Sequence, residues 1–213
     1  MRMRKKKHRD ARIEARADLL YIGRSDPDAP LVQAGDANFP VFLEIGCGKG
    51  GFICELAESK PNINFVALER NPDVLVLAME RAHNLDLKNV RFLMGDAENL
   101  ADYFEPGQIA GIYLNFSDPW HKNRQAHKRL TYKDFLDIYK NIMMPGAKII
   151  MKTDNVNLFD FSVRSLVNNG FKVINQTRDL YSSEFLAGNV ATEYERKFVS
   201  EGVKICRLEA AYI

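Results

Sequence analysis

The residues best suited to chemistry lie in one short segment near the middle of the chain. Asp118, Pro119 and Trp120 follow an apolar, strand-like run at 109–116, and a basic segment at 121–129 comes directly after them. An indole ring offers a flat face on which a nucleic-acid base can stack, and Lys and Arg side chains can pair with phosphates. This combination favours an enzyme that acts on one base of a nucleic acid. The alternative is a Pro-Trp turn that packs against the core, followed by a solvated loop.

A glycine-rich turn lies earlier in the chain, between a predicted strand and a predicted helix. Residues 41–45 form a short apolar run typical of a buried strand, and 52–57 carry apolar residues at helical spacing. Glycines at such a junction let the backbone turn tightly and approach a ligand closely. The pattern fits both the dinucleotide-binding turn and the turn of S-adenosylmethionine enzymes, but not a phosphate-binding P-loop. The turn reads Gly46-Cys47-Gly48-Lys49-Gly50-Gly51.

Four carboxylates fall at or just beyond the ends of successive predicted strands. The strands are expected at 41–45, 64–68, 89–94 and 109–116, and the acids are Glu44, Glu69, Asp96 and Asp118. In an open α/β sheet, ligands bind at the carboxyl ends of the strands. Any one of these acids alone is more readily a helix cap or a turn residue. Four together suit the amino group and ribose of a sulfonium cofactor, and they suit the pyrophosphate of NAD poorly.

The composition is that of one soluble globular domain. The chain has 213 residues, of which 46% are hydrophobic and 27% charged. No apolar run approaches the roughly 18 residues that a membrane-spanning helix needs. The start of the chain lacks the apolar segment of a signal peptide, so we expect a cytoplasmic protein without a membrane segment. Three cysteines without a C-x-x-C pair and four scattered histidines predict neither disulfides nor a metal site.

The positive charge is concentrated at the N-terminus. Six of the 30 Lys and Arg residues lie within the first nine positions, which hold none of the 28 acidic residues. A basic arm of this kind attracts a polyanion, although a disordered solubilising tail is the alternative. A helix is expected over 11–21, and proline and aspartate then break it at 26–30. We therefore predict a basic arm with a short helix at 1–37, followed by a single domain at 38–213.

The rest of the chain continues the alternation of strands and helices. A capping box, Thr192 with Glu195, marks the start of the last predicted helix. Further helices are expected after Asn71-Pro72-Asp73 and over 132–143 and 158–167, and further strands over 147–151, 171–175 and 203–213. This alternation predicts an α/β fold with a mostly parallel sheet covered on both faces.

Taken together, these motifs closely resemble the bacterial tRNA (guanine-N7)-methyltransferases. The resemblance runs from about residue 40 to the C-terminus and includes the basic arm. Glycine turns are shared by many methyltransferases, whereas the Asp-Pro-Trp and Thr-x-x-Glu blocks at this spacing are far more specific. The motifs are Glu44 to Gly50, Asn115 to Trp120, Arg129 to Tyr132, Lys152 to Asn155 and Thr192 to Glu195.

The resemblance implies a class I methyltransferase fold, which is Rossmann-like and has seven mostly parallel strands, the last antiparallel, with helices on both faces. It also implies transfer of a methyl group from S-adenosylmethionine to N7 of the variable-loop guanine of tRNA (position 46 in tRNA numbering). From the residues themselves we expect no metal and infer no obligate protein partner. Asp118 would be the catalytic residue. The implied cofactor-binding residues are Glu44, Gly46, Gly48, Gly50, Glu69, Asp96 and Asp118. The implied substrate- and RNA-binding residues are Lys122, Arg124, Lys128, Arg129, Asp154, Thr192 and Glu195.

Three alternative functions remain open from the sequence. An amino-methyltransferase acting on adenine or cytosine is one, because Asp-Pro-Trp resembles the Asp-Pro-Pro-aromatic motif of those enzymes, although the second proline is missing. A nicotinamide oxidoreductase fits the glycine turn and Glu69, but it leaves the two basic segments without a purpose. A non-catalytic RNA-binding protein with this fold is the third, and the intact set of acids argues against it.

Overall fold

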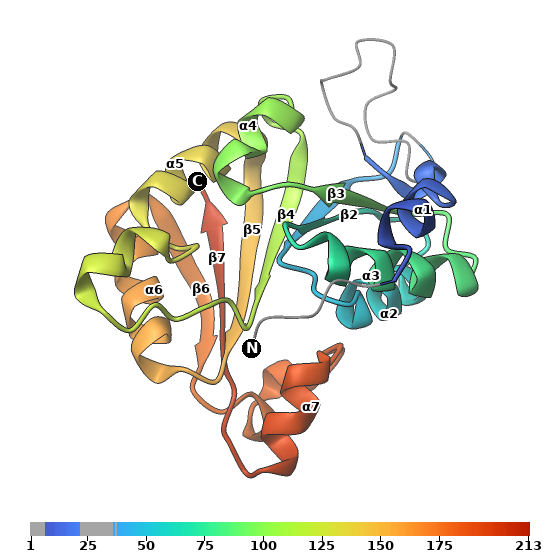
Figure 1. The fold of residues 1–213 in the computed structure, drawn as a ribbon. Coiled ribbons are helices and arrows are strands. Elements are labelled where there is room, and N and C mark those ends of the chain that lie inside the picture. The colour runs from blue at the N-terminus through green and yellow to red at the C-terminus, as the bar shows by residue number, and fades with distance from the viewer. Residues whose placement is uncertain (1–6, 22–35, 37) are drawn as a thin grey trace. The chain divides into compact units, whose positions relative to one another are not determined.

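The computed structural model describes residues 7–21, 36 and 38–213, so the predicted helix break at 26–30 lies outside the described residues. The strands are β1 (Val41–Ile45), β2 (Asn64–Glu69), β3 (Val90–Met94), β4 (Ile109–Asn115), β5 (Met143–Thr153), β6 (Phe171–Thr177) and β7 (Cys206–Tyr212). They form a seven-stranded sheet in the order β3-β2-β1-β4-β5-β7-β6 (Figure 1). Strand β7 runs antiparallel to both β5 and β6. The order and the antiparallel last strand confirm the predicted class I methyltransferase fold.

The chain divides into two compact units, residues 1–104 and 105–213. In the first unit, β1 pairs with β2 and β2 pairs with β3, both in parallel. Its helices are α1 (Arg9–Glu14), α2 (Gly51–Ser59), α3 (Pro72–Asn84) and α4 (Leu100–Tyr103). Helix α3 begins where the sequence predicts, because the Asn71 side chain accepts a hydrogen bond from the Asp73 N–H and Pro72 occupies the first turn.

Part of the predicted basic arm belongs to the first unit and packs against its helix α3 and strand β3. The Arg12 guanidinium donates two hydrogen bonds to the Glu80 carboxylate, with N–O distances of 2.8 and 2.6 Å. The Tyr21 N–H donates to the Phe92 carbonyl at 2.8 Å, and the Tyr21 ring stacks on Phe104 with centroids 5.3 Å apart. The helix predicted over 11–21 is instead α1 at Arg9–Glu14, followed by a short 3₁₀ helix at Ala17–Leu19. The chain becomes extended at Leu20, which bridges to Phe92 of β3.

The docking of α1 should depend on pH through Glu80. Hydrogen bonds from Arg12 lower the pKa of Glu80 below its usual value, although partial burial opposes the shift. A carboxyl with a depressed folded-state pKa stabilises the structure above its unfolded pKa and loses that effect as the pH falls through its folded pKa. We expect amide exchange in α1, corrected for intrinsic rates, to accelerate below about pH 4. Glu80→Gln should show fast exchange already near neutral pH, and a wild-type-like profile for this variant would contradict the assignment.

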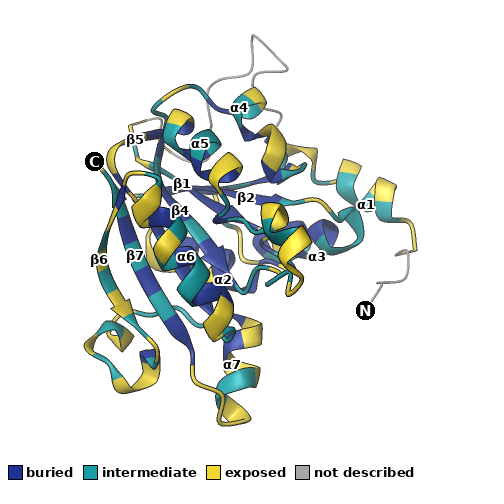
Figure 2. Ribbon diagram, turned by 90° about the vertical axis from the view of Figure 1, so that its left-hand side faces the viewer, coloured by how far each residue is buried: buried dark blue, intermediate teal, exposed yellow. Residues whose placement is uncertain are grey.

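The second unit carries β4, β5, β7 and β6, with helices α5 (Lys133–Ile142), α6 (Val156–Asn168) and α7 (Glu193–Ser200). Helix α6 covers the sheet with a buried side and presents exposed residues on its other side (Figure 2). Helix α7 lies at the end of the sheet where β7 begins (Figure 1). Strand β5 starts at Met143 rather than at Ala147, because Met143 already pairs with Ile109 before the register shifts between Ile109 and Gly111.

Candidate active site

The glycine turn after β1 adopts a conformation that requires glycine. Gly46, Gly48 and Gly50 have φ angles of +81°, +58° and +74°, a region that residues with side chains rarely adopt. The N–H groups of Gly46 and Cys47 donate to the Leu68 carbonyl at 2.8 and 2.9 Å. The turn is thus fastened to β2, the strand that carries the next predicted acid.

Two of the predicted cofactor-binding acids lie against this turn. The Glu69 carboxylate accepts hydrogen bonds from the N–H of Gly48 at 3.1 Å and the N–H of Asn71 at 2.8 Å, which fix its orientation. Glu44 is buried near the end of β1. Burial raises the pKa of the Cys47 thiol well above its usual value, and the nearby charges of Glu44 and Glu69 raise it further. The structure therefore brings Glu44 and Glu69 together beside Cys47.

Asp96 lies beyond the end of β3, on the same edge of the sheet. Glu69 pairs in register with Met94, and Asp96 follows two residues later. The Asp96 side chain accepts a hydrogen bond from the Glu98 N–H at 3.3 Å and so caps a short 3₁₀ helix. The predicted placement at the ends of adjacent strands is confirmed for these three acids, and Asp96 also serves as the helix cap that the sequence offered as an alternative.

Replacing glycines in the turn should have different effects at different positions. A Cβ on Gly50 would lie 2.8 Å from the Ala78 Cβ and 3.0 Å from the Ala78 Cα, whereas no described atom lies within 4 Å of a Cβ on Gly48. Gly50→Ala should lower the free energy of unfolding by about 2–5 kcal/mol, from overpacking added to left-handed strain. Gly48→Ala should cost only the strain, about 1–2 kcal/mol. Urea unfolding of both variants tests this, and equal losses would contradict the packing role of Gly50.

In the second unit, Asp118 lies on a loop whose backbone is held in an unusual conformation. Phe116 and Trp120, on either side of it, have φ angles of +51° and +44°. The Phe116 N–H donates to the Lys152 carbonyl at 2.8 Å, which ties the start of the loop to β5. The Asp118 side chain is exposed, and no described residue donates a hydrogen bond to it. Its position is therefore set by the loop backbone.

The basic segment that follows forms a 3₁₀ helix, Asn123–Lys128. Lys122 and Arg124 are exposed, and no described residue pairs with their charges. The Lys128 ammonium lies 4.9 Å from the centroid of the half-buried Trp120 ring, within cation–π range. Because Lys128 covers one face of this ring, a base would have to stack on the opposite face or displace the lysine.

Arg129 differs from the other cations of the segment, because its guanidinium is engaged within the protein. Its Nε donates to the Pro119 carbonyl and its Nη2 to the Trp120 carbonyl, each at 3.0 Å. The guanidinium carbon also lies 4.4 Å from the centroid of the Phe161 ring. These contacts within the protein are not encoded in the local sequence, which groups Arg129 with the RNA-binding cations.

The remaining predicted substrate residues lie near the end of β5 and the start of α7. Asp154 is half-buried just beyond β5. The Thr192 hydroxyl accepts from the Glu195 N–H at 2.9 Å, and the Glu195 carboxylate accepts from the Thr192 N–H at 3.3 Å. This reciprocal pair confirms the predicted capping box.

A buried ion pair that no local sequence pattern predicts joins α7 to β5. The Lys152 ammonium lies 2.6 Å from the Glu195 carboxylate, and the two side chains are 3% and 0% exposed. Lys152 also donates to the Val190 carbonyl at 2.7 Å. Glu195 accepts further hydrogen bonds from Tyr181 at 3.2 Å and from the Asn189 amide at 2.6 Å. Glu195 is thus surrounded by protein donors and acts as an anchor for α7.

Comparison with known proteins identifies the family. Residues 38–208 match a family described as "Putative methyltransferase". The tRNA (guanine-N(7)-)-methyltransferase of Brevibacillus brevis is 46% identical over 192 residues, which cover 87% of this chain and 90% of that protein. The enzyme of the same name from Clostridioides difficile is 41% identical, and the alignment covers 99% of this chain and 98% of that protein. The chain belongs to the tRNA (guanine-N7)-methyltransferase family.

Structural comparison agrees with this family at the level of the fold. The structure of the 16S rRNA methyltransferase KamB aligns with a TM-score of 0.62 and 15% identity, and covers 99% of this chain and 95% of that one. Membership of a methyltransferase family sets aside the nicotinamide oxidoreductase alternative. Within the described residues, no helix has the length and apolar character needed to cross a membrane, and no group of three or more His, Cys, Asp or Glu side chains could hold a metal ion.

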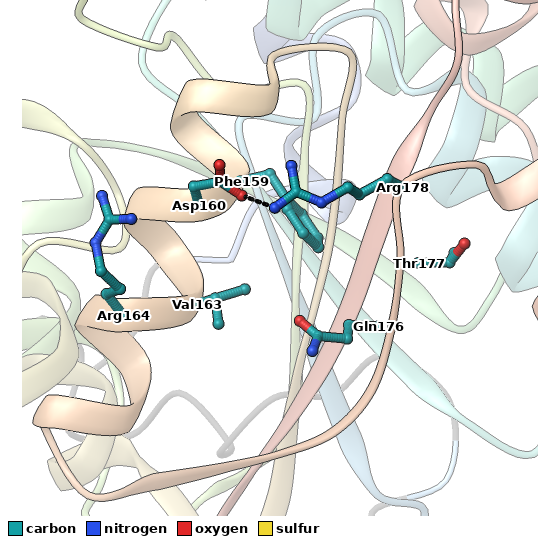
Figure 3. A pocket seen from close by; sticks show the side chains of 7 residues that line it. All are labelled: Phe159, Asp160, Val163, Arg164, Gln176, Thr177 and Arg178. Atoms are coloured by element: carbon teal, nitrogen blue, oxygen red, sulfur yellow. Dashed lines mark hydrogen bonds and ion pairs between the residues drawn. The ribbon is translucent and has the colours of Figure 1, made fainter.

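A groove of about 480 Å³ between α6 and β6 is distinct from the site predicted for this methyltransferase (Figure 3). An ion pair between Arg178 and Asp160, with an N–O distance of 2.5 Å, crosses it. The other lining residues are Phe159, Val163, Arg164, Gln176 and Thr177. None of the predicted cofactor- or substrate-binding residues lines this groove.

Proposed function

We propose that this protein transfers the methyl group of S-adenosylmethionine to N7 of the variable-loop guanine of tRNA. The observation that carries the proposal is the exposed carboxylate of Asp118, held on a fixed loop beside Trp120 and directly before an exposed basic segment, in a chain of this family. A carboxylate can accept hydrogen bonds from a guanine, and the basic segment can pair with phosphates.

The donor would be held by the glycine turn and the acids of the first unit. The Glu69 carboxylate is already oriented by two backbone N–H groups and can accept hydrogen bonds from ribose hydroxyls. Gly46 and Gly48 lack side chains where the backbone would approach the ligand. Glu44 and Asp96 complete the set, and the family resemblance adds Asp118. When bound, S-adenosylmethionine supplies an electrophilic methyl group on a sulfonium.

The reaction itself needs little acid–base chemistry from the protein. Guanine N7 has an in-plane lone pair and no hydrogen, so no general base is required. The bond between sulfur and the methyl carbon breaks as the bond between N7 and that carbon forms, and the positive charge moves from the sulfonium to the guanine. Catalysis should therefore rest on holding the reacting atoms in line with water excluded, which can supply on the order of 7–11 kcal/mol.

Asp118 would orient the target base. Its carboxylate can accept hydrogen bonds from the guanine N1–H and 2-amino group, an edge that adenine does not present. As N7 is methylated, the guanine gains a positive charge, which a nearby carboxylate offsets. The role thus combines selection of the base with stabilisation of the transition state.

The RNA backbone would be held by the exposed cations after Trp120. Lys122, Arg124 and Lys128 offer charges for phosphates, and such contacts make affinity strongly dependent on salt. Asp154 and Thr192 are proposed to contact the substrate nucleotide, following the family motifs. Glu195 is proposed to act at the same place, chiefly by fixing the start of α7.

A tRNA transcript with 7-deazaguanine at the variable-loop position tests the proposal. This analogue replaces N7 with C–H and keeps the base-pairing edge that Asp118 would read. We expect the protein to bind both transcripts with equal affinity and to methylate only the guanine form. Methyl transfer to the 7-deaza transcript at the normal rate would show that another atom or nucleotide is the target.

A further inference from the structure

We propose that Arg129 is a positioning residue that holds the Asp118 loop in its working conformation. The inference rests on the proposed role of Asp118, and it assigns the half-buried Arg129 side chain to contacts within the protein rather than to contact with RNA. It accounts for three features: the conformation of the loop, the geometry of the guanidinium, and the anchoring of Arg129 on α6.

The loop requires an external support. Phe116 and Trp120 have positive φ angles, which bulky residues adopt rarely and only where the surroundings fix them. The Phe116 N–H is held by the Lys152 carbonyl of β5 at 2.8 Å. At the other end of the loop, the carbonyls of Pro119 and Trp120 accept hydrogen bonds from Arg129, each at 3.0 Å.

The guanidinium is suited to this contact in a way that a lysine is not. Its planar fork presents Nε and Nη2 donors with a fixed separation, and here these two donors reach the carbonyls of consecutive residues. Because both carbonyls belong to residues directly after Asp118, a shift of Arg129 would be transmitted to the Asp118 backbone. A lysine at this position could donate to one carbonyl but could not reproduce the fork.

Arg129 is itself held in place by α6. Its guanidinium lies 4.4 Å from the centroid of the Phe161 ring. Two residues later, Thr131 forms a buried hydrogen bond of 2.7 Å with Ser162, the next residue of α6 after Phe161. The rigid helix therefore fixes Arg129, and Arg129 fixes the carbonyls after Asp118. Lys122 and Arg124, in contrast, are exposed, and no described residue pairs with the charges of their side chains.

The proposal predicts that Arg129→Lys, which keeps the charge, impairs turnover rather than RNA binding. We expect kcat to fall by about 10- to 100-fold, because a small displacement of an orienting group is costly. The Kd for tRNA and its dependence on salt should stay at wild-type values. Trp120 is the only tryptophan, so its fluorescence reports on the loop directly. Acrylamide quenching of this fluorescence should increase, and this readout does not depend on methyl transfer.

Arg124→Ala is the matched control from the same segment. It should lower the slope of log affinity against log salt by about one, and it should leave Trp120 quenching unchanged. If Arg129→Lys does not fold, as judged by urea unfolding, Phe161→Leu provides the test, because it removes the ring under the guanidinium and retains Arg129. This variant should also lower kcat and increase quenching.

Two results would overturn the proposal. Wild-type kcat and quenching in Arg129→Lys would show that the fork is not needed. A smaller salt slope with wild-type quenching in Arg129→Ala would place the guanidinium on the RNA. A wild-type protein that transfers no methyl group would refute the proposed function, whereas the quenching comparison would still decide whether Arg129 holds the loop.

Discussion

Replacing Asp118 with alanine should abolish most of the methyl transfer while the protein still binds its donor. We expect kcat to fall by about 100-fold or more, the scale seen when one preorganised electrostatic group is removed from an active site. Affinity for S-adenosylhomocysteine should fall by much less, because Glu44, Glu69 and Asp96 are retained. Single-turnover rates of methyl transfer measure the first effect, and equilibrium binding of S-adenosylhomocysteine measures the second.

Two further variants identify what the carboxylate contributes. Ser117→Ala alters the neighbouring position on the same loop and should leave the rate near that of wild type. Asp118→Asn keeps the shape of the side chain and one acceptor oxygen but removes the charge. A near-normal rate in Asp118→Asn would eliminate the proposed charge stabilisation and leave only an orienting role.

Replacing Lys152 with methionine should strongly destabilise the fold. The Lys152–Glu195 pair is almost fully buried, with its charged atoms 2.6 Å apart. Removing one partner of such a pair leaves an uncompensated buried charge and typically costs about 3–5 kcal/mol. Urea unfolding should therefore show a lower midpoint for Lys152→Met, and α7 should be the first helix to unfold.

Helix α7 supplies its own control for this prediction. Lys197 pairs with Glu201 at 3.9 Å on the same helix, but their side chains are 65% and 52% exposed. Lys197→Met should cost less than about 1 kcal/mol. Adding Glu195→Gln to Lys152→Met should recover part of the loss, because the buried charge is then removed. A Lys152→Met variant as stable as Lys197→Met would show that the buried pair does not anchor α7.

The parts of the fold that follow local patterns were predictable from the sequence. The strands up to β4 and the helix starts at Asn71 and Thr192 were found, because apolar runs, glycine turns and caps are local signals. The placement of Glu44, Glu69 and Asp96 on one edge of the sheet was predictable, because each lies at or next to the carboxyl end of a predicted parallel strand. The start of β5 was missed, since its pairing with Ile109 across a register shift is not encoded locally.

The contacts that fix the second unit's site were not predictable in the same way. Lys152 and Glu195 are 43 positions apart, so nothing near either residue identifies the other as its partner. Phe and Trp carry no preference for positive φ, and the conformation of Phe116 and Trp120 is imposed by their surroundings. The sequence does not distinguish Arg129 from the other cations of the basic segment. Its role depends on its hydrogen bonds to the Pro119 and Trp120 carbonyls, which only the structure shows.

The most direct test of the proposed function is transfer of a radiolabelled methyl group from S-adenosylmethionine to tRNA that lacks the modification, followed by nucleoside analysis. We predict label in 7-methylguanosine alone, and loss of that label when the variable-loop guanine is replaced by adenine. Label in another nucleoside, or label that persists after this replacement, would contradict the proposed target. No label at all, with the donor bound and the protein folded, would contradict the proposed activity.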